Sequence, residues 1–349
     1  LKDGAIIYDS SIVNTSIDEI PTIEADHRVR LHEFFKSKNM EPKVSSIIEL
    51  AKESGVNVYP ISFRDTLSNI ADELKRPELS RMTRMFNVLG VSFSLGVLKA
   101  PIAPLLESIE EIFSTKPTIA DLNKKAANFA YNYASAKFSG FNASLNETDK
   151  EPNIMLVQGH QGSALGKMVC GCRFQSYYPI TPASDESEFL ETHEILQVKE
   201  DRPGSTTIVQ TEDEISAIGM AVGASLTGTR SATSTSGPGF SLMAETLGWA
   251  AINEVPVVIS LFQRSGPSTG LPTRHGQDDL LFAINAGHGE FPRIVYASGD
   301  VEDSFYDTGK CFNFADIFQL PVIHILDKFI ASSVVTCNRF EPDLVSIDR

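Results

Sequence analysis

Beyond residue 153 the chain alternates short apolar runs with amphipathic segments of about a dozen residues, and this alternation constrains the fold more than any other feature. The apolar runs contain β-branched residues and read NIMLVQ, SATSTS and VPVVISLF. The amphipathic segments include DEISAIGMAVGASLTG and FSLMAETLGWAAINE. Strands that alternate with helices at this spacing predict βαβ units and a parallel sheet covered on both faces. Ligands of such sheets bind at the carboxyl ends of the strands.

The first part of the chain predicts a separate α/β module over residues 1–139. Its patterns indicate a strand in NVYPISF and long helices in RMTRMFNVLGVSFSLGVLKA and KPTIADLNKKAANFAYNYASAKF. The polar stretch GFNASLNETDKEPN has no periodicity and predicts a linker over residues 140–152. We therefore expect a second domain over residues 153–349. A strand-like run, AIIYDSSIV, follows the first residues almost at once, so we expect the chain to begin inside a domain.

Composition and charge exclude several classes of protein. With 42% hydrophobic and 21% charged residues the chain is typical of a globular protein. No apolar run approaches the ~20 residues that span a bilayer, and no signal segment opens the chain, so we expect a cytoplasmic protein without a membrane partner. Residues 151–349 hold 12 Lys and Arg against 25 Asp and Glu, a net charge of −13. This charge makes nucleic acid an unsuitable partner, and it predicts that the phosphates of any phosphorylated cofactor are held by a partner chain.

The four cysteines, Cys170, Cys172, Cys311 and Cys337, show no C-x-x-C spacing typical of a zinc or iron–sulfur site. We interpret them as buried free thiols. Any cluster would therefore be held by another chain.

The stretch YYPITPASDESEFLE interrupts a hydrophobic run with two prolines and then resumes a helical pattern. Thr181 can cap that helix, Pro182 can occupy its first turn, and the acidic residues that follow suit a positive helix end. This purely structural interpretation explains every residue type. A hydroxyl group at the carboxyl edge of a parallel strand is also placed to meet a ligand, so both interpretations stay open.

The stretch VQTEDEISAIGMAVGAS begins a helix with three acidic residues, Glu212, Asp213 and Glu214, and continues with small apolar ones. The acidic residues can be first-turn carboxylates and nothing more. The small residues allow a neighbouring backbone to approach closely, and a carboxylate held there would be partly buried, with a raised pKa.

The stretch SLFQRSGPSTGLPTRHGQ ends an apolar strand at Arg264 and continues into a loop rich in Gly, Pro, Ser and Thr. A guanidinium at a strand's carboxyl end, beside backbone donors, is a natural receptor for a carboxylate. The alternative is an ion pair with one of the many acidic residues. Nearby, STSGPGF is neither a dinucleotide fingerprint nor a phosphate loop, and we interpret it as a tight strand-to-helix turn.

Taken in order, four stretches resemble the alpha subunit of 2-oxoacid:ferredoxin oxidoreductases, in the pyruvate:ferredoxin oxidoreductase superfamily. They are GHQGSALGKMVCGCRFQSYYPITPASDESEFLE, VQTEDEISAIGMAVGAS, SATSTSGPGFSLMAETLGWAAINEVPVVI and QRSGPSTGLPT. Residues 1–139 resemble the gamma domain that is fused in front of the alpha region in the archaeal type. The resemblance implies a parallel-sheet gamma domain followed by the pyrimidine-binding α/β domain of a thiamine diphosphate enzyme.

This resemblance implies oxidative decarboxylation of 2-oxoacids such as pyruvate, 2-oxobutyrate and 2-oxoglutarate to acyl-coenzyme A and CO₂. Thiamine diphosphate would be shared with a beta subunit, which would also hold Mg²⁺ and a [4Fe-4S] cluster. Coenzyme A would be the co-substrate and ferredoxin the electron acceptor. The alternatives are the corresponding half of a non-redox thiamine diphosphate enzyme and a non-catalytic scaffold subunit.

The motifs also imply site residues. Glu214 stands five residues before Gly219 and best matches the glutamate that bonds N1′ of the aminopyrimidine, with Glu212 as the second choice. Thr181 would offer its hydroxyl group to the 2-oxoacid, and Arg264 would hold the carboxylate.

The sequence departs from the family's pattern in three places. The usual G-N-Q or G-N-E stretch reads Gly159-His160-Gln161, and PTRHGQDD stands where PTRTEQGD is commoner. The glycine-rich opening of a gamma domain and the additional domain after the alpha region do not appear in this sequence. Contacts that those segments supply to the substrate or to coenzyme A cannot be assigned to it.

Overall fold

The computed structural model describes residues 3–73, 75–77, 82–138, 140–145, 153–199 and 202–349. Internal contacts divide the chain into two compact units, Leu1–Lys150 and Glu151–Arg349. The boundary falls within the predicted linker, of which residues 146–152 lie outside the described part. The two units are considered separately below.

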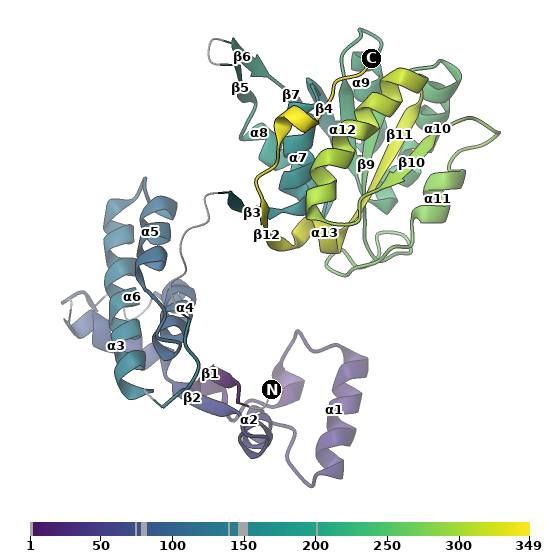
Figure 1. Ribbon diagram of the computed structural model, residues 1–349. Helices are drawn as coiled ribbons and strands as arrows, with labels where there is room; N and C mark the ends of the chain where they lie inside the picture. The colour runs from purple at the N-terminus through teal and green to yellow at the C-terminus, as the bar shows by residue number, and fades with distance from the viewer. Residues whose placement is uncertain (1–2, 74, 78–81, 139, 146–152, 200–201) are drawn as a thin grey trace. The chain divides into compact units, whose positions relative to one another are not determined.

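The first unit combines a pair of parallel strands with helices (Figure 1). The predicted long helices are present as α4 and α6, although Arg81 lies outside the described residues. Alanines spaced along α6 let α4 approach closely, since a Cβ atom at Gly96 would lie 2.6 Å from the Tyr131 carbonyl oxygen. The elements are β1 (Ala5–Asp9), η1 (Ser10–Ile12), η2 (Ile17–Glu19), α1 (Ala25–Ser37), α2 (Val44–Glu53), β2 (Asn57–Ile61), α3 (Phe63–Glu73), η4 (Thr83–Met85), α4 (Phe86–Val97), α5 (Ala103–Ile112) and α6 (Pro117–Lys137).

The second unit is built on a six-stranded parallel sheet of order β10-β11-β9-β8-β4-β7. The central strands β8, β9 and β11 are buried along their whole length, as expected for a sheet covered on both faces. The strands are β4 (Phe174–Tyr177), β7 (Thr207–Gln210), β8 (Ser231–Thr235), β9 (Val257–Gln263), β10 (Ile294–Ala297) and β11 (Pro321–Asp327). The predicted α/β fold with a parallel sheet is confirmed.

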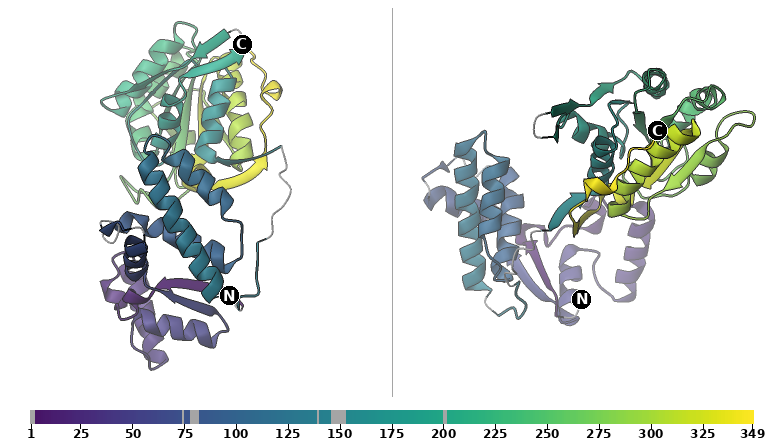
Figure 2. Two further views of the ribbon diagram at one scale, coloured as in Figure 1. Left: turned by 90° about the vertical axis from the view of Figure 1, so that its left-hand side faces the viewer. Right: turned by 45° about the horizontal axis from the view of Figure 1, so that its top comes forward.

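Helices cover both faces of this sheet (Figures 1 and 2). One face packs against α9, α10 and α11, and the other against α7 and α12. The helices are α7 (Gly159–Val169), α8 (Ser184–Glu191), α9 (Glu214–Ser225), α10 (Gly237–Ile252), α11 (Leu280–Asn285), α12 (Val301–Phe318) and α13 (Lys328–Ser332), followed by η5 (Pro342–Leu344). The carboxyl ends of the strands therefore form one edge between two helical layers.

The run NIMLVQ forms β3 (Ile154–Gln158) but does not join the parallel sheet, so this part of the prediction is wrong. It pairs in antiparallel fashion with β12 (Val334–Asn338). Both strands keep several side chains exposed, which a central strand of a covered sheet would not. A second antiparallel pair consists of β5 (Ile195–Lys199) and β6 (Arg202–Ser205).

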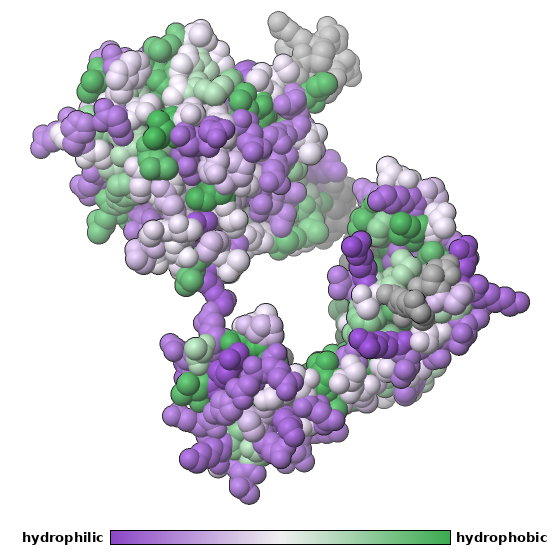
Figure 3. Space-filling model, turned by 180° about the vertical axis from the view of Figure 1, so that it is seen from behind, coloured by the Kyte–Doolittle hydropathy of each residue, from purple (hydrophilic) through white to green (hydrophobic). Residues whose placement is uncertain are grey.

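Exposed apolar residues lie among hydrophilic ones on the face of each unit drawn in Figure 3. Within the described residues, no helix has the length and apolar character needed to cross a membrane.

Candidate functional site

Three predicted site residues follow three strands of the same sheet. Thr181 comes after β4, Glu214 after β7 and Arg264 directly after β9. Because the strands are parallel, all three lie at the carboxyl edge of the sheet, where ligands of open α/β sheets bind. The fold thus brings together residues up to 83 positions apart, and the Arg264 Nη1 donates to the Thr181 carbonyl oxygen.

Glu214 is the first residue of α9 and its side chain is buried, with 6% of its surface exposed. The cap of the helix is Asp213, whose Oδ1 accepts a hydrogen bond from the Ser216 N–H at 2.7 Å. Burial raises the pKa of the Glu214 carboxyl group, and the charge of Asp213 adds to that rise. Glu212 is exposed. The two glutamates therefore differ in environment, and Glu214 is the one whose raised pKa favours holding a proton.

The first turn of α10 leaves room for two carboxyl groups, which explains the glycines of STSGPGF. A Cβ atom at Gly239 would lie 2.5 Å from Glu214 Oε1 and 2.2 Å from Thr235 Oγ1. A Cβ atom at Gly237 would lie 2.6 Å from Asp279 Oδ1. The predicted strand-to-helix turn is present between β8 and α10, but its glycines also make space for side chains at the edge of the sheet.

Arg264 is a buried cation, with 4% of its surface exposed. Its Nη1 donates to the Thr181 carbonyl oxygen at 2.5 Å and its Nη2 to the Thr269 carbonyl oxygen at 2.8 Å. Its Nε is buried without a hydrogen-bond partner, and among the described residues no carboxylate forms an ion pair with it. Burial lowers the pKa of the guanidinium group, and the charge of Asp279 opposes that effect. Two neutral carbonyl groups thus orient a cation that retains free donors.

The prediction that Thr181 caps the next helix is wrong. Helix α8 begins at Ser184, its cap is Ala183, and no side chain bonds its first N–H groups. Ala183 is buried against Phe262 and Leu326, so packing sets the start of the helix instead of a capping hydroxyl group. Thr181 is exposed and its carbonyl group is held by Arg264. Its hydroxyl group is therefore not needed for the cap.

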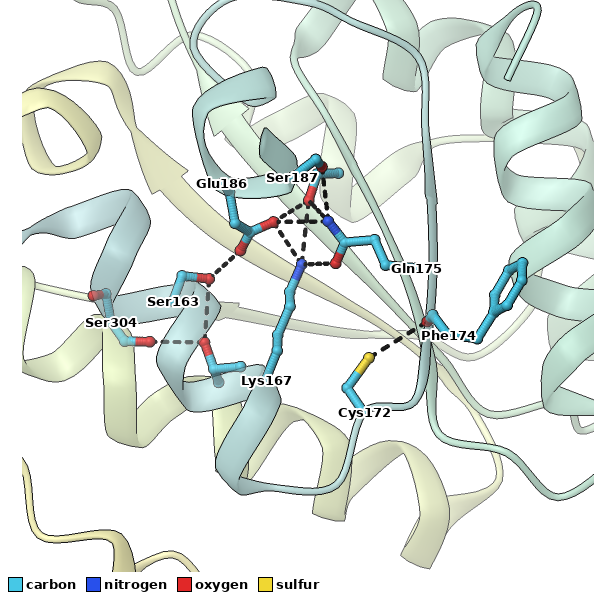
Figure 4. Close-up of polar contacts among 10 residues, drawn as sticks. Ser163, Lys167, Cys172, Phe174, Gln175, Glu186, Ser187 and Ser304 are labelled. Atoms are coloured by element: carbon cyan, nitrogen blue, oxygen red, sulfur yellow. Dashed lines mark hydrogen bonds and ion pairs between the residues drawn. The ribbon is translucent and has the colours of Figure 1, made fainter. Parts of the chain in front are cut away.

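Beneath this edge lies an ion pair that the sequence analysis missed (Figure 4). Lys167 of α7 and Glu186 of α8 are both fully buried, and Nζ lies 2.6 Å from Oε2. Lys167 Nζ also donates to Gln175 Oε1 at 2.7 Å. Burial opposes ionisation of Glu186, but the ammonium group of Lys167 outweighs it and holds the pKa of the carboxyl group below its ordinary value. The position of Glu186 in the sequence is typical of an exposed first-turn carboxylate. In the structure its side chain is instead buried and paired with Lys167.

The hydrogen-bonding groups of this pair are satisfied by polar neighbours (Figure 4). Ser163 and Ser234 donate to the two oxygens of Glu186, and Gln175 Nε2 donates to Ser187 Oγ at 2.8 Å. The network joins α7 and α8 to strands β4 and β8. Its member Glu186 stands 5 residues after Thr181, so the network fixes the helix that follows this threonine.

Family comparisons agree with this geometry. Residues 165–347 match the family described as pyruvate flavodoxin/ferredoxin oxidoreductase, thiamine diP-bdg (thiamine diphosphate-binding). The chain belongs to this family. Residues 1–133 match a second family, pyruvate ferredoxin/flavodoxin oxidoreductase. The predicted resemblance to this pyruvate oxidoreductase superfamily is confirmed.

Curated members of the superfamily are similar over nearly the whole chain. The alpha subunit of 2-oxoacid:ferredoxin oxidoreductase 1 from Sulfurisphaera tokodaii is 41% identical over 336 residues, which are 95% of this chain and 52% of that protein. The corresponding subunit from Aeropyrum pernix is 40% identical over 357 residues, covering 100% and 55%. The chain thus spans about half the length of the curated relatives it matches.

A solved structure of the superfamily has a similar fold. It is 2-oxoglutarate:ferredoxin oxidoreductase from Magnetococcus marinus with 2-oxoglutarate, coenzyme A and succinyl-CoA bound. The TM-score is 0.71 at 33% identity, over 84% of this chain and 49% of that one.

Three of the four cysteines are buried. Cys170, Cys172 and Cys311 are buried free thiols, as predicted, and Cys337 is half-buried. Burial raises the pKa of Cys170 to about 12 and that of Cys172 to about 11, which leaves these thiols protonated and unreactive.

Asp279 is a further residue at the edge that the sequence analysis passed over. It lies in PTRHGQDD, the stretch that departs from the family's commoner form. The signal available in the sequence was its position directly before an apolar segment, and that signal fits an ordinary helix start equally well.

Proposed function

We propose that this chain is part of a thiamine diphosphate-dependent 2-oxoacid:ferredoxin oxidoreductase. It would convert a 2-oxoacid, coenzyme A and oxidised ferredoxin to acyl-coenzyme A, CO₂ and reduced ferredoxin. The names of its relatives and the 2-oxoglutarate and coenzyme A bound to the Magnetococcus marinus enzyme support this activity. We assign residues 1–139 to a gamma-type domain, residues 140–152 to a linker and residues 153–349 to the pyrimidine-binding domain.

The observation that carries the proposal is the buried guanidinium of Arg264, which has free donors and no ion-pair partner among the described residues. A buried charge is costly unless it is paired, so this position fits an anionic ligand. A carboxylate accepts two parallel hydrogen bonds from a guanidinium. Thr181, whose carbonyl oxygen accepts a hydrogen bond from Arg264, would offer its hydroxyl group to the ketone of the substrate. Together the two residues would recognise the part that all 2-oxoacids share, which predicts a broad substrate range.

The residues present fit the aminopyrimidine of thiamine diphosphate. Glu214 is a desolvated carboxyl group beside the first turn of α10, and the absence of a side chain at Gly239 leaves room for that carboxyl group. When bound, thiamine diphosphate supplies the nucleophilic carbon that attacks the ketone. Glu214 would hold a proton at N1′ of the pyrimidine, and its raised pKa suits that general acid–base task.

A partner subunit of the beta type would supply the rest of the site. The net charge of −13 over residues 151–349 disfavours a diphosphate, so the diphosphate and its Mg²⁺ belong on the partner. The same partner would hold the [4Fe-4S] cluster that passes electrons to ferredoxin. Coenzyme A would accept the acyl group.

Co-purification with a beta-type subunit tests the proposal. The complex should reduce a low-potential dye in the presence of a 2-oxoacid, and coenzyme A should increase the rate. The chain alone should be inactive and should bind thiamine diphosphate weakly. Tight, Mg²⁺-dependent binding of the cofactor by the isolated chain, measured by calorimetry, would contradict the division of the site between two subunits. Turnover of no 2-oxoacid by the complex would contradict the activity itself.

A further inference from the structure

The carboxyl group of Asp279 occupies an unusual position at the edge of the sheet. Its backbone N–H is held by the Gln263 side chain at 3.0 Å, and Gln263 is the last residue of β9. Its side chain lies against Gly237, in the first turn of α10. Its Oδ2 is buried and has no hydrogen-bond partner among the described residues. Asp279 is therefore fixed by its backbone while one of its oxygens lacks a partner.

The charged groups around Asp279 belong to the site already described. Arg264 follows Gln263 directly, and the charges of Arg264 and Asp279 act on each other although no ion pair joins them. Asp278 is the neighbour in sequence, and Glu214 lies beside Gly239, two residues along α10 from Gly237. Burial raises the pKa of Asp279, the charge of Asp278 raises it further, and Arg264 opposes both effects.

We propose that Asp279 is a positioning residue that acts through Arg264, and that a 2-oxoacid binds together with a proton on the Asp279 carboxyl group. This inference rests on the proposed function. Before binding, the ionised Asp279 is the anion that partly balances the buried guanidinium. When the substrate carboxylate arrives at Arg264, the two negative charges repel each other, and protonation of Asp279 removes the repulsion.

The sign of the pH dependence follows from linkage. The bound carboxylate disfavours the ionised form of Asp279, so its pKa is higher in the complex than in the free enzyme. Below both pKa values Asp279 is protonated in either state, and affinity does not change with pH. Between them a proton is taken up on binding, so the affinity for the 2-oxoacid falls as pH rises. Pyruvate stays a monoanion and Arg264 stays a cation throughout this range.

The test uses the complex of this chain with its beta-type partner. The KM of pyruvate and the inhibition constant of oxamate, an unreactive analogue, are measured from pH 5.5 to 8.5 at saturating coenzyme A. In the wild-type complex we expect both constants to rise by about tenfold, the effect of one pKa unit of coupling between like charges. Asp279→Asn should make both constants independent of pH and should leave them near their low-pH values. The pH profile of kcat should keep its shape.

Asp278→Asn is the matched control, because it removes the same charge one residue away. Its carboxyl group accepts a hydrogen bond from the Gly266 N–H at 3.4 Å. The control should keep the wild-type slope of both constants. A flat wild-type profile, an unchanged slope in Asp279→Asn, or equal flattening in both variants would overturn the inference. In each of these cases the complex still turns over pyruvate, so the proposed function would stand.

Discussion

Two sets of buried charges in the second unit differ in how completely they are paired. Lys167 and Glu186 are fully buried, 2.6 Å apart, and surrounded by donors and acceptors from two strands. Arg264 is almost as deeply buried, but within the described part of the chain its Nε has no hydrogen-bond partner, and an oxygen of the nearby Asp279 also lacks one. A buried polar atom without a partner costs free energy. The first set is therefore paired within this chain, whereas we propose that a ligand completes the second.

Under the proposed function, this difference distinguishes a structural pair of charges from a ligand-binding charge within one sheet. Replacing both members of a satisfied buried pair with apolar residues is often neutral, while removing one member leaves a costly charge. An unpaired buried cation gains instead from an added anion. Depth of burial does not distinguish the two cases, because all four side chains are largely or partly withdrawn from solvent.

The largest expected effect is on stability, from breaking the complete pair. Lys167→Met leaves Glu186 as a buried charge without its cation, and we expect the free energy of unfolding to fall by about 3 to 5 kcal/mol. Chemical denaturation of the chain measures this. The matched variant Lys167→Met/Glu186→Leu should recover most of the loss. If the double variant is as unstable as the single one, the hydrogen-bond network and not the unpaired charge accounts for the effect.

The next effect is on turnover. Glu214→Gln should lower kcat of the complex by roughly 100-fold or more, the scale for loss of a positioned acid–base group. The same substitution should raise the free energy of unfolding at pH 7. Because burial raises the pKa of Glu214, the folded state gains from the protonated form at low pH and loses that gain as pH rises through the raised pKa. The Gln variant should therefore unfold less readily than the wild type at pH 7, but not at low pH.

Glu212→Gln is the control for that experiment, since Glu212 is exposed in the same segment. It should change kcat far less. A larger effect at Glu212 than at Glu214 would mean that the motif has been aligned two residues out of place.

A smaller effect on kcat/KM is expected from substitution of Arg264. Lysine keeps the charge of Arg264 but cannot reach the carbonyl oxygens of Thr181 and Thr269 with two arms and still bind a carboxylate. Arg264→Lys should lower kcat/KM for pyruvate, 2-oxobutyrate and 2-oxoglutarate by similar factors, about 1 to 3 kcal/mol in transition-state stabilisation. Steady-state kinetics on the three acids checks this. A loss confined to one acid would assign Arg264 to side-chain selection.

The smallest effect is on the free energy of unfolding, from filling the space that Gly239 leaves for the Glu214 side chain. Gly239→Ala would place a methyl group on Glu214 and Thr235, and we expect a net cost of about 1 kcal/mol after the gain in helix propensity. Gly219→Ala, in α9, meets no atom within 4 Å and should stabilise by about 0.5 to 1 kcal/mol. Thermal unfolding of both variants measures the contrast. Equal stabilisation by both would show that Glu214 moves aside without cost.

Several features were determined by the sequence alone. The run VPVVISLF, buried on both faces, specifies a central strand of a parallel sheet because a largely apolar strand is unsuited to a wet surface. The order of strand and helix then places residue 264 at the carboxyl edge, since the residue after each parallel strand lies on one side of the sheet. Four ordered motifs were enough to predict the family.

Only the tertiary structure decided which polar groups are paired. Glu186 and Glu214 both stand in the first turn of a helix, and local sequence gives them the same interpretation. Lys167 reaches Glu186 from another helix, whereas Glu214 faces the glycine at 239 and forms no ion pair with any residue that the structure describes. The run NIMLVQ likewise pairs with β12, and even the nearest paired residues, Gln158 and Val334, are 176 positions apart in the sequence. These outcomes depend on contacts between segments distant in the chain, and neither periodicity nor propensity records such contacts.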